Sequence, residues 1–589
     1  MSEERLLAEL SADRVWQSVT DIVEQFPSRL AGTEVAWSAA GYLYDQLRAE
    51  GIAAELMEYP GLVSFPGEGS LEVISPQPRT IPASVLGHSL STPPGGIEGD
   101  LVDAGRGTWD SCEQVGVAGK IVLSDLSYFP PRQEKQRIMA LQGAIGSVLL
   151  NWGYDNSDLL PYGSVKPCWG NPTRLTKRTE MPEIPVLGVS RAAGLWLRAM
   201  AAQGRVRLRI RAQSSDEWRK LRQAIGWVRS DGTQEFAILG GHMDGWYGQA
   251  ATDNAAGNAL FLEIGRVFQR YADELKRGLA VGFWVGHETG TMVGSTHFVD
   301  SHWDDLRENA VAYLQVDQPG IVGTTIWETK SDVELHDYHF EVERRILGEK
   351  MESEWKRLTR TGDSSFFGVG VPSISSRSVF TRAEVDAMGN GDLGWWHHTE
   401  ANTLDKLDKE LLGTHLRVYA AYLWGLCTLP ILPARFAPAV KLMVQRLEKL
   451  IPEADGIDLA GPTRLAKDAL EAVERLDSVA DSWRERARGR EVSGEVQEIL
   501  NDALKRLSRI LVPLGGTVAG VYGHDPYGLS AQSTLLPGLH DLPRMNRLPA
   551  GSEERYLLFT ELVRQRNRVA DAMREVRDLA GRTATAVQV

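Results

Sequence analysis

Polar side chains of the kinds that bind metal ions follow several apolar runs of the sequence. Two imidazoles and three carboxylates form this set: His242, Asp253, Glu288, Asp317 and His398. Imidazole and carboxylate groups are ligands that zinc and similar divalent cations accept in proteins. Any one of these residues alone is weak evidence, because a lone aspartate after a strand is usually a cap or a turn residue. The ordered set is what favours a site for one or two cations.

The elements that must position these residues can be read from hydrophobic patterning. Short apolar runs at 235–239, 279–285 and 310–316 read as buried strands. A helical pattern over 254–271 lies between the first two runs, so strands alternate with helices. This alternation predicts an α/β sheet with helices on both faces, and such sheets build their sites at the carboxyl ends of strands.

Composition and residue pattern divide the remaining chain into further parts. Residues 1–58 have helical spacing and are assigned to the N-terminal part of the domain whose main part is the α/β region 214–432. Residues 59–213 are rich in Gly, Pro and short β-type runs, which predicts a separate β-rich domain. Residues 433–589 predict a helical domain, because long helical patterns cover 437–450, 463–488, 494–511 and 551–580.

Bulk properties exclude some classes of function. A chain of 589 residues exceeds a single core, so several domains are expected. The formal net charge of −14 disfavours nucleic acid and anionic membranes as partners, because there is no basic surplus to neutralise phosphates. No apolar run reaches the roughly 18 residues that a membrane-spanning helix needs. We therefore expect neither a nucleic-acid partner nor a membrane partner.

Cysteine usage and the N-terminal residues bear on the compartment. The three cysteines, Cys112, Cys168 and Cys427, are far apart in the sequence and odd in number. This usage favours a reducing compartment without a disulfide framework. The first residues, MSEERLLAELSADRVW, are charged and lack the apolar core of a secretory signal. We therefore expect a cytoplasmic protein.

Taken in order, these motifs resemble those of the co-catalytic zinc aminopeptidases, a superfamily that includes glutamate carboxypeptidase and the transferrin receptor. The matching segments are SRLAGT at 28–33, GGHMDGW at 240–246, GQAATDNAAG at 248–257, WVGHETGTMVGS at 284–295, GDSSF at 362–366 and HTEANTLDKLD at 398–408. Residues 115–150 resemble the protease-associated domain that is inserted in the carboxypeptidase branch. The resemblance implies a mixed central sheet flanked by helices, an inserted β-rich protease-associated domain, and a C-terminal helical domain that makes a homodimer.

The resemblance also implies roles for individual residues. It implies two zinc ions, or other divalent metals, with Asp253 bridging them. His242 and Asp317 would complete one site, and Glu288 and His398 would complete the other. Asp244 would orient the imidazole of His242. With two divalent cations and three carboxylate ligands the site carries a net charge of about +1, which favours an anionic substrate.

One position departs from the family pattern. Relatives have a glutamate before the ligand Glu288, and it takes the proton from the attacking water. This chain has His287 there. Histidine has an ordinary pKa of about 6.5, so it can accept a proton near neutral pH. Three readings stay open: a replacement general base in a hydrolase, a proton shuttle in a lyase or cyclase on the same fold, or lost catalysis with the metals kept. His397 is a competing base beside the last ligand.

Several side chains near the predicted ligands are expected to bind substrate. They are Trp246, Tyr247, Ser364, Trp395, Trp396 and His397. Core packing is the alternative for the aromatic residues. Arg377 and Arg382 follow the GDSSF segment and could bind a carboxylate, although surface solvation is the alternative for both.

These observations predict a binuclear zinc-dependent hydrolase, a metallopeptidase of aminopeptidase or carboxypeptidase type. Its substrate would be a small molecule or short peptide with an amide bond. A non-hydrolytic two-metal enzyme is the first alternative, and a catalytically silent receptor-like binding protein is the second.

Overall fold

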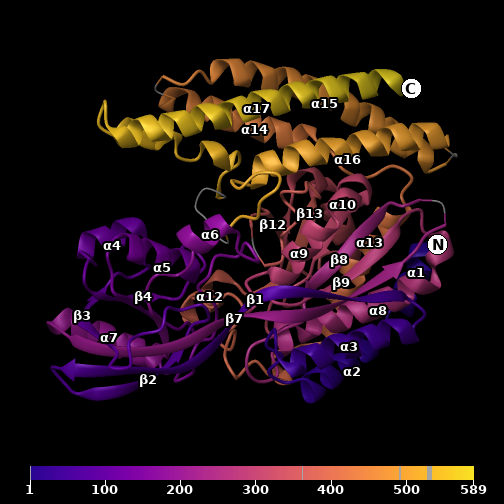
Figure 1. Cartoon of the computed structure of the whole chain (residues 1–589). Coiled ribbons are helices and arrows are strands. Elements are labelled where there is room, and N and C mark those ends of the chain that lie inside the picture. The colour runs from indigo at the N-terminus through magenta and orange to yellow at the C-terminus, as the bar shows by residue number, and fades with distance from the viewer. Residues whose placement is uncertain are drawn as a thin grey trace.

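The computed structural model describes residues 2–231, 233–360, 362–454, 456–489, 492–526 and 533–588. Within these ranges the strands join side by side in the order β1-β2-β6-β5-β4-β3-β7-β9-β8-β10-β13-β11-β12. Parallel and antiparallel neighbours both occur, so the sheet is mixed, as predicted. Figure 1 shows three parts: a β-rich lobe early in the chain, a sheet covered by helices in the middle, and a layer of long helices formed by the last residues.

The catalytic part is centred on strands β8 (Phe236–His242), β9 (Gly278–Trp284) and β10 (Ala310–Gln315), which run parallel to one another. The sheet continues through β13 (Ser373–Val379), β11 (Ile326–Ser331) and β12 (Glu352–Arg357). The predicted apolar runs therefore form neighbouring strands whose carboxyl ends meet at one edge. The ligand candidates follow at that edge.

Both faces of these strands are buried, because neighbouring side chains point in opposite directions. Leu239 and Val281 pack into the core formed with helices α2 (Ala12–Gln25), α3 (Glu34–Ala49), α8 (Ala256–Arg270) and α13 (Lys409–Thr428). Ile238 and Ala280 pack into a second core with α9 (Val293–Ser301) and α10 (Trp303–Asn309). Helices α1 (Ser2–Glu9), α11 (His336–Leu347) and α12 (Arg382–Ala387) complete this part. The predicted helices on both faces of the sheet are thus confirmed.

Two long strands connect the catalytic part to the β-rich lobe. β1 (Ala53–Ser75) and β7 (Arg207–Val228) pair antiparallel along almost their whole length. The predicted domain boundaries at 58/59 and 213/214 lie inside these continuous strands. β7 pairs with β9 at one end and with β3 at the other, so one ribbon belongs to both parts. Figure 1 shows this ribbon crossing from one lobe to the other.

The lobe has its own strands and its own cores. Its strands are β2 (Arg79–Val85), β3 (Ile97–Asp103), β4 (Ile121–Asp125), β5 (Gly146–Leu150) and β6 (Val186–Val189). Its helices are α4 (Trp109–Val115), α5 (Arg132–Leu141), α6 (Arg174–Thr179) and α7 (Arg191–Gln203). Two apolar clusters lie on opposite sides of these strands. The helix predicted between two strands at 132–142 is α5.

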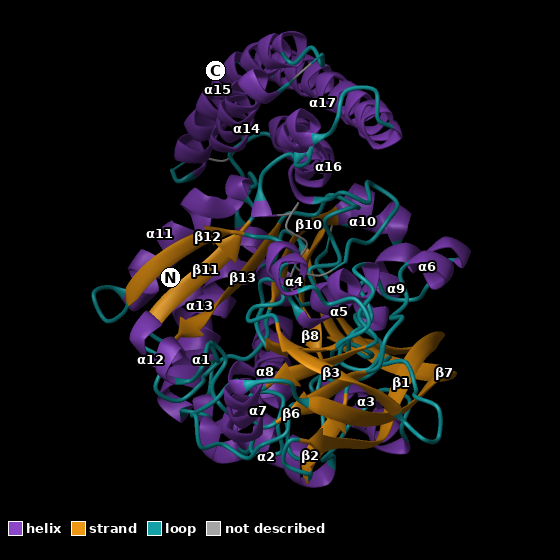
Figure 2. Ribbon diagram, turned by 90° about the vertical axis from the view of Figure 1, so that its left-hand side faces the viewer, coloured by secondary structure: helices purple, strands orange, loops and turns teal. Residues whose placement is uncertain are grey.

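The C-terminal part consists of helices α14 (Ala437–Leu450), α15 (Ala460–Ala487), α16 (Gly494–Gly516) and α17 (Glu553–Ala586). These bounds agree with the predicted helical patterns to within a few residues. Figure 2 shows the four helices gathered as a layer beside the catalytic sheet. Among the described residues, no helix combines the length and apolar character that crossing a bilayer requires.

Candidate metal centre and active site

The five predicted ligands come together although they arise from separate segments. Asp253 lies at their centre: its Oδ1 is 3.1 Å from His242 Nε2, and its Oδ2 is 3.2 Å from His398 Nε2. Asp317 Oδ1 is 3.4 Å from His242 Nε2, and Glu288 Oε1 is 3.3 Å from His398 Nε2. The two oxygens of Asp253 thus face two different groups of ligands, one on each side.

These residues fit a pair of divalent cations. Ligand atoms bound tetrahedrally at about 2.0–2.1 Å from one ion lie roughly 3.3 Å from each other, which matches the observed separations. Three buried atoms, His242 Nε2, Glu288 Oε1 and Asp317 Oδ1, make no hydrogen bond with the described residues. Buried polar atoms without partners are rare in folded proteins and call for an explanation such as an ion. The donor set of two imidazoles and three carboxylates suits zinc.

Asp244 supports the site in a way the sequence reasoning did not anticipate. The backbone carbonyl of Asp244, and not its carboxylate, lies 2.8 Å from His242 Nδ1. This contact leaves Nε2 of the imidazole to face the metal site. The buried carboxylate of Asp244 instead accepts hydrogen bonds from the backbone N–H groups of Gly286, His287 and Glu288, at 3.0 to 3.1 Å. Asp244 therefore holds the loop that carries the unusual histidine and its neighbouring ligand.

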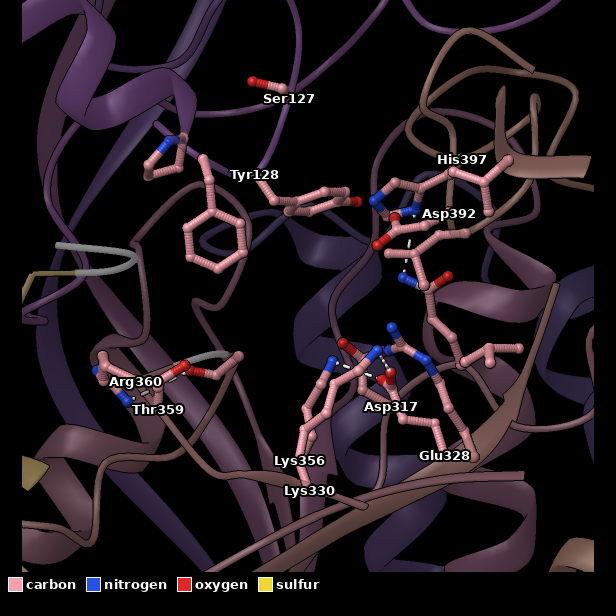
Figure 3. A pocket seen from close by; sticks show the side chains of 18 of the residues that line it. Ser127, Tyr128, Asp317, Glu328, Lys330, Lys356, Thr359, Arg360, Asp392 and His397 are labelled. Atoms are coloured by element: carbon pink, nitrogen blue, oxygen red, sulfur yellow. Dashed lines mark hydrogen bonds and ion pairs between the residues drawn. The ribbon is translucent and has the colours of Figure 1, made fainter. Parts of the chain in front are cut away.

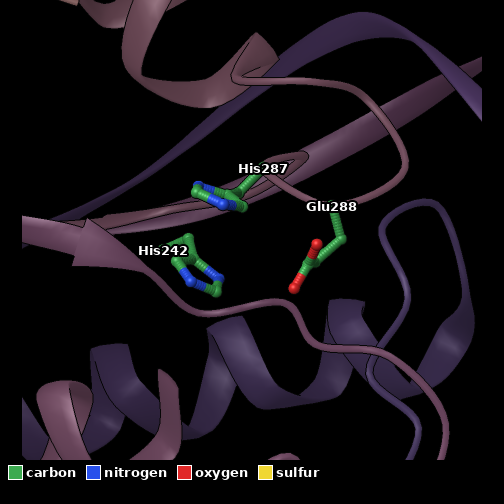
Figure 4. Close-up of side chains that lie close together, drawn as sticks. All are labelled: His242, His287 and Glu288. Carbon is green, nitrogen blue, oxygen red and sulfur yellow. The ribbon is translucent and has the colours of Figure 1, made fainter. Parts of the chain in front are cut away.

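His287 lies directly over the ligand His242. Their rings stack with centroids 3.8 Å apart, and Figure 4 shows both side chains beside the carboxylate of Glu288. One ligand-type atom from each of these three residues lies within 4.8 Å of the others. The other contact of His287 is with Asp363, whose Oδ2 is 2.9 Å from Nδ1.

Asp363 belongs to the GDSSF segment, but its pairing with His287 was not predicted. The carboxylate is 1% exposed, and its Oδ1 accepts a hydrogen bond from Ser295 Oγ at 2.7 Å. Burial opposes the ionisation of Asp363, but the positive field and hydrogen bond of His287 outweigh this and lower the pKa of the carboxyl. Asp363 is therefore a carboxylate that can only accept from the imidazole.

The ligands Glu288 and His398 are oriented by distant segments. Trp246 donates from Nε1 to Glu288 Oε2 at 2.6 Å. His398 Nδ1 lies 3.2 Å from the backbone carbonyl of Tyr162, which belongs to the β-rich lobe. Ser164 of the same lobe donates from Oγ to the carbonyl of Glu288 at 2.7 Å. The lobe thus helps to hold two predicted metal ligands.

Arg29 holds the backbone that connects His242 to Asp253, and the sequence predicted no role for it. It is 1% exposed and donates to the backbone carbonyls of Met243, Gln249 and Ala250 at 2.8 to 3.1 Å. Burial lowers the pKa of this guanidinium to about 10, although nearby carboxylates act in the opposite direction. Its position in the SRLAGT motif was the only sequence signal.

A cavity of about 630 Å³ opens onto the metal centre. Its wall includes Asp253, Asp317 and His398, and His287 also lines it. The β-rich lobe contributes the segment around Tyr128, while β11 and β12 contribute the far wall. The volume suits a small molecule or a short peptide fragment.

Of the six residues expected to bind substrate, only His397 lines this cavity, and Arg377 and Arg382, which could bind a carboxylate, line it as well. Trp246 donates its indole N–H to Glu288, and Ser364 Oγ donates to Gln315 Oε1 at 2.5 Å. Trp396 is 4% exposed and packs on the half-buried Trp395, and neither residue lines the cavity. Tyr247 packs edge-on against Tyr162, outside the lining. For these aromatic residues the packing alternative describes their position better than a role in the cavity wall.

His397 is held between the lobe and the metal centre. Its ring stacks on Trp152 with centroids 5.2 Å apart, and Gln318 Nε2 lies 3.2 Å from Nδ1. Nδ1 of His397 also lies 3.3 Å from Asp253 Oδ2, so this nitrogen faces both an amide and a carboxylate of the candidate metal centre. Burial and the neighbouring His398 lower the pKa of His397 to about 4. The side chain is therefore a neutral imidazole at physiological pH.

The far wall of the cavity is rich in charge. Apart from the ligand carboxylates, seven arginine and lysine side chains line the cavity against three carboxylates. Figure 3 shows Lys330 and Lys356 both directed to Glu328, and Lys330 Nζ lies 2.8 Å from Glu328 Oε1. Arg377 on β13 also lines the wall, and its Nε makes no hydrogen bond with the described residues. Burial disfavours its charge, but Asp392, Glu328 and Asp317 raise its pKa. Arg377 therefore faces the cavity as a cation.

Comparison with known proteins shows a likeness to peptidases. Residues 225–423 match peptidase family M28. A probable lipoprotein aminopeptidase of Mycobacterium tuberculosis is 25% identical over 66% of this chain and 78% of its own length. A probable glutamate carboxypeptidase of Zea mays is 24% identical over 87% of this chain and 81% of its own length.

Solved structures show the same fold. A peptidase M28 precursor from Shewanella amazonensis has a TM-score of 0.58 and 20% identity, covering 72% of this chain and 95% of its own. A zinc aminopeptidase from Bacillus subtilis has a TM-score of 0.53 and 18% identity, covering 71% and 96%. Residues 225–423 therefore match the model of peptidase family M28, and the chain is similar to aminopeptidases and glutamate carboxypeptidases.

Proposed function

We propose that this protein is a binuclear zinc hydrolase that cleaves an amide bond in a small, peptide-like substrate, with His287 as its general base. The observation that carries the proposal is the convergence of five ligand side chains around Asp253, with three buried atoms left for an ion. His242, Asp253 and Asp317 would hold one cation, and Asp253, Glu288 and His398 would hold the other. Such cations supply Lewis acidity and lower the pKa of a bound water.

Residues of this chain then transfer protons and hold the base during hydrolysis. His287 accepts a proton as water attacks the carbonyl carbon of the substrate. When the C–N bond breaks, His287 returns that proton to the leaving nitrogen, so that an amine and a carboxylic acid are released. Asp244 holds the loop that carries the base. His397 is neutral and adjacent to the same centre, so it can bind substrate without adding charge.

The charge of the site supports an anionic substrate. Two divalent cations with three carboxylate ligands leave about +1, and the cavity wall adds more cations than carboxylates. A substrate with a carboxylate beside the scissile amide would pair with Arg377, whose Nε makes no hydrogen bond within the part of the chain that the structure describes.

A substrate panel tests the hydrolase proposal. Metal-loaded protein should hydrolyse at least one compound among aminoacyl amides, neutral dipeptides and acidic dipeptides, and chelation should abolish the activity. No turnover of the whole panel by protein with two equivalents of zinc would favour the lyase or cyclase alternative. Less than one equivalent of zinc after purification in metal-containing buffer would favour a silent binding protein.

Two further expectations remain proposals. We propose a homodimer formed through the C-terminal helices, because Tyr556 and Leu557 of α17 are 63% and 66% exposed.

We also propose a cytoplasmic location, since all three cysteines are buried without disulfide partners. Cell fractionation with an antibody to the native protein tests the location, and recovery in a membrane or secreted fraction would contradict it.

A further inference from the structure

His287 departs from the family pattern, and its contacts show how the chain accommodates a histidine. A neutral imidazole can act as a base only at the nitrogen that carries no proton. Which nitrogen that is depends on the hydrogen bond made by the other one. The neighbours of His287 therefore decide whether its free nitrogen faces the reaction.

Asp363 Oδ2 lies 2.9 Å from Nδ1 of His287, and both side chains are almost fully buried. A carboxylate has no proton to donate, so Nδ1 must carry the proton and donate it. Nε2 is then the nitrogen left to accept. Figure 4 shows one ring nitrogen of His287 turned toward the space between His242 and Glu288.

The carboxylate of Asp363 is itself held in place. Ser295 Oγ donates to Asp363 Oδ1 at 2.7 Å and lies 2.8 Å from Ser365 Oγ. Arg360 donates to Ser365 Oγ at 3.1 Å, and Arg360 is 2% exposed. Both oxygens of Asp363 thus have defined partners, and a buried chain of hydrogen bonds fixes the direction in which the carboxylate points.

We propose that Asp363 is the positioning residue of a histidine–aspartate dyad, which fixes the Nδ1–H form of His287 and leaves Nε2 to take the proton of the attacking water. This inference rests on the proposed function, in which His287 is the base. It adds a residue that the glutamate of relatives does not need in this role, because a carboxylate base has no tautomers. Ser295 contributes by holding Asp363.

The chain offers a matched control for a buried histidine–carboxylate pair. On α11, His339 Nδ1 lies 3.0 Å from Glu343 Oε1, and their side chains are 0% and 1% exposed. Neither residue lines the cavity. Loss of this pair should lower stability in the same way as loss of the Asp363 pair, but it should leave the reaction unaffected.

The first test is kinetic and uses the metal-loaded protein with its best panel substrate. Asp363→Asn should lower kcat by about 100-fold, with KM changed by less than about threefold and zinc content unchanged. Ser295→Ala should lower kcat by a smaller factor. Glu343→Gln should keep kcat within about twofold. In a His287→Ala background, Asp363→Asn should cause no further loss, because the residue acts through the histidine.

A spectroscopic test does not depend on turnover. In protein labelled with ¹⁵N-histidine, the signal that disappears in His287→Ala should show a protonated Nδ1 and an unprotonated Nε2. Asp363→Ala should change this pattern, whereas Glu343→Gln should not. An unchanged pattern in Asp363→Ala, or equal kcat values for Asp363→Asn and the native protein, would overturn the proposal. Failure of the native protein to cleave any panel substrate would instead overturn the proposed hydrolase, and the tautomer measurement would still decide the role of Asp363.

Discussion

At the scale of single residues, the identity of residue 287 decides which base chemistry is available. The imidazole stacks on the ligand His242 and binds Asp363, so its surroundings are arranged for a histidine. A glutamate at this position would place its carboxylate beside Asp363, and two adjacent carboxylates repel each other. The substitution that restores the family pattern therefore needs a partner.

We expect His287→Glu combined with Asp363→Asn to give more aminopeptidase activity on a neutral aminoacyl amide than His287→Glu alone. The second change removes the repulsion between the two carboxylates. Initial rates for both variants and for the native protein check this expectation. If neither variant cleaves the amide while the native activity also vanishes, then histidine has chemistry of its own at this site.

The cationic side chain of Arg377 lines the cavity, where it can bind a carboxylate of the substrate. Arg377→Ala should raise KM about tenfold or more for substrates with a carboxylate, because a charge-assisted hydrogen bond contributes about 1.5–3 kcal/mol. KM for neutral substrates should change little. The exposed Arg137, which pairs with Glu134 on α5, provides a control through Arg137→Ala. An equal rise in KM for neutral and anionic substrates would contradict the assignment.

At the scale of elements, two basic side chains of α16, Lys505 and the buried Arg509, bond to the catalytic part. Arg509 donates to the carbonyls of Leu306, Arg307, Ala310 and Gly370 at 2.5 to 2.9 Å. Burial lowers its pKa to about 9, and the charge persists at neutral pH. Among these carbonyls, that of Leu306 also accepts from the backbone N–H of Ala310.

We expect Arg509→Ala to lower the free energy of unfolding by about 3–5 kcal/mol, because it removes four buried hydrogen bonds that a charged group donates. Arg506→Ala on the same helix should change it by less than about 0.5 kcal/mol, since Arg506 is exposed and pairs with Asp502 at 3.5 Å. Denaturant titration of both variants measures the difference. Similar stabilities for the two variants would mean that the apolar face of α16 and Lys505 hold the helix without Arg509.

The segment between β11 and α11 carries a buried pair of carboxyl groups. Burial raises the pKa of Asp332 to about 7, and burial together with Asp332 raises that of Glu334 to about 8. In the unfolded chain both groups titrate near their ordinary values of about 4. Between about pH 4 and 8 these two carboxyls therefore hold more protons in the folded protein than in the unfolded chain, so their contribution to stability falls as the pH rises.

Glu334→Gln should make stability depend less steeply on pH, because the amide does not titrate. Free energies of unfolding at pH 5, 6, 7 and 8 for the native protein and the variant check the slope. Glu349→Gln, at a charged site that is exposed, should leave the slope unchanged. A native stability that rises steadily from pH 5 to 8, with no difference in slope for Glu334→Gln, would show that these carboxyls are ionised in the folded state.

At the scale of the whole molecule, the cavity forms where parts distant in sequence meet. The β-rich lobe supplies Tyr162, which contacts the ligand His398, and the segment around Tyr128, which lines the cavity. The catalytic part supplies the metal ligands. The C-terminal helices attach to the catalytic part through Arg509 and expose apolar side chains on α17.

The proposed homodimer predicts a change of mass. Leu557→Glu should convert a dimer of about twice 65.0 kDa into a monomer, because a charge in an apolar interface is costly. Analytical ultracentrifugation measures the mass. Leu429→Glu, at a residue that is 38% exposed outside the C-terminal helices, is the control and should stay dimeric. A native protein that sediments as a monomer would contradict the dimer.

The sequence by itself predicted the candidate ligand set, the strands before it and the long C-terminal helices. These features are local: apolar periodicity marks the elements, and the order of polar residues after them is written along the chain. Only the tertiary structure decided that Asp363 pairs with His287 across 76 positions, that Tyr162 holds His398 across 236, and that Trp246 serves Glu288 and does not line the cavity. Such contacts depend on how strands and loops pack in space, and no local pattern encodes that packing.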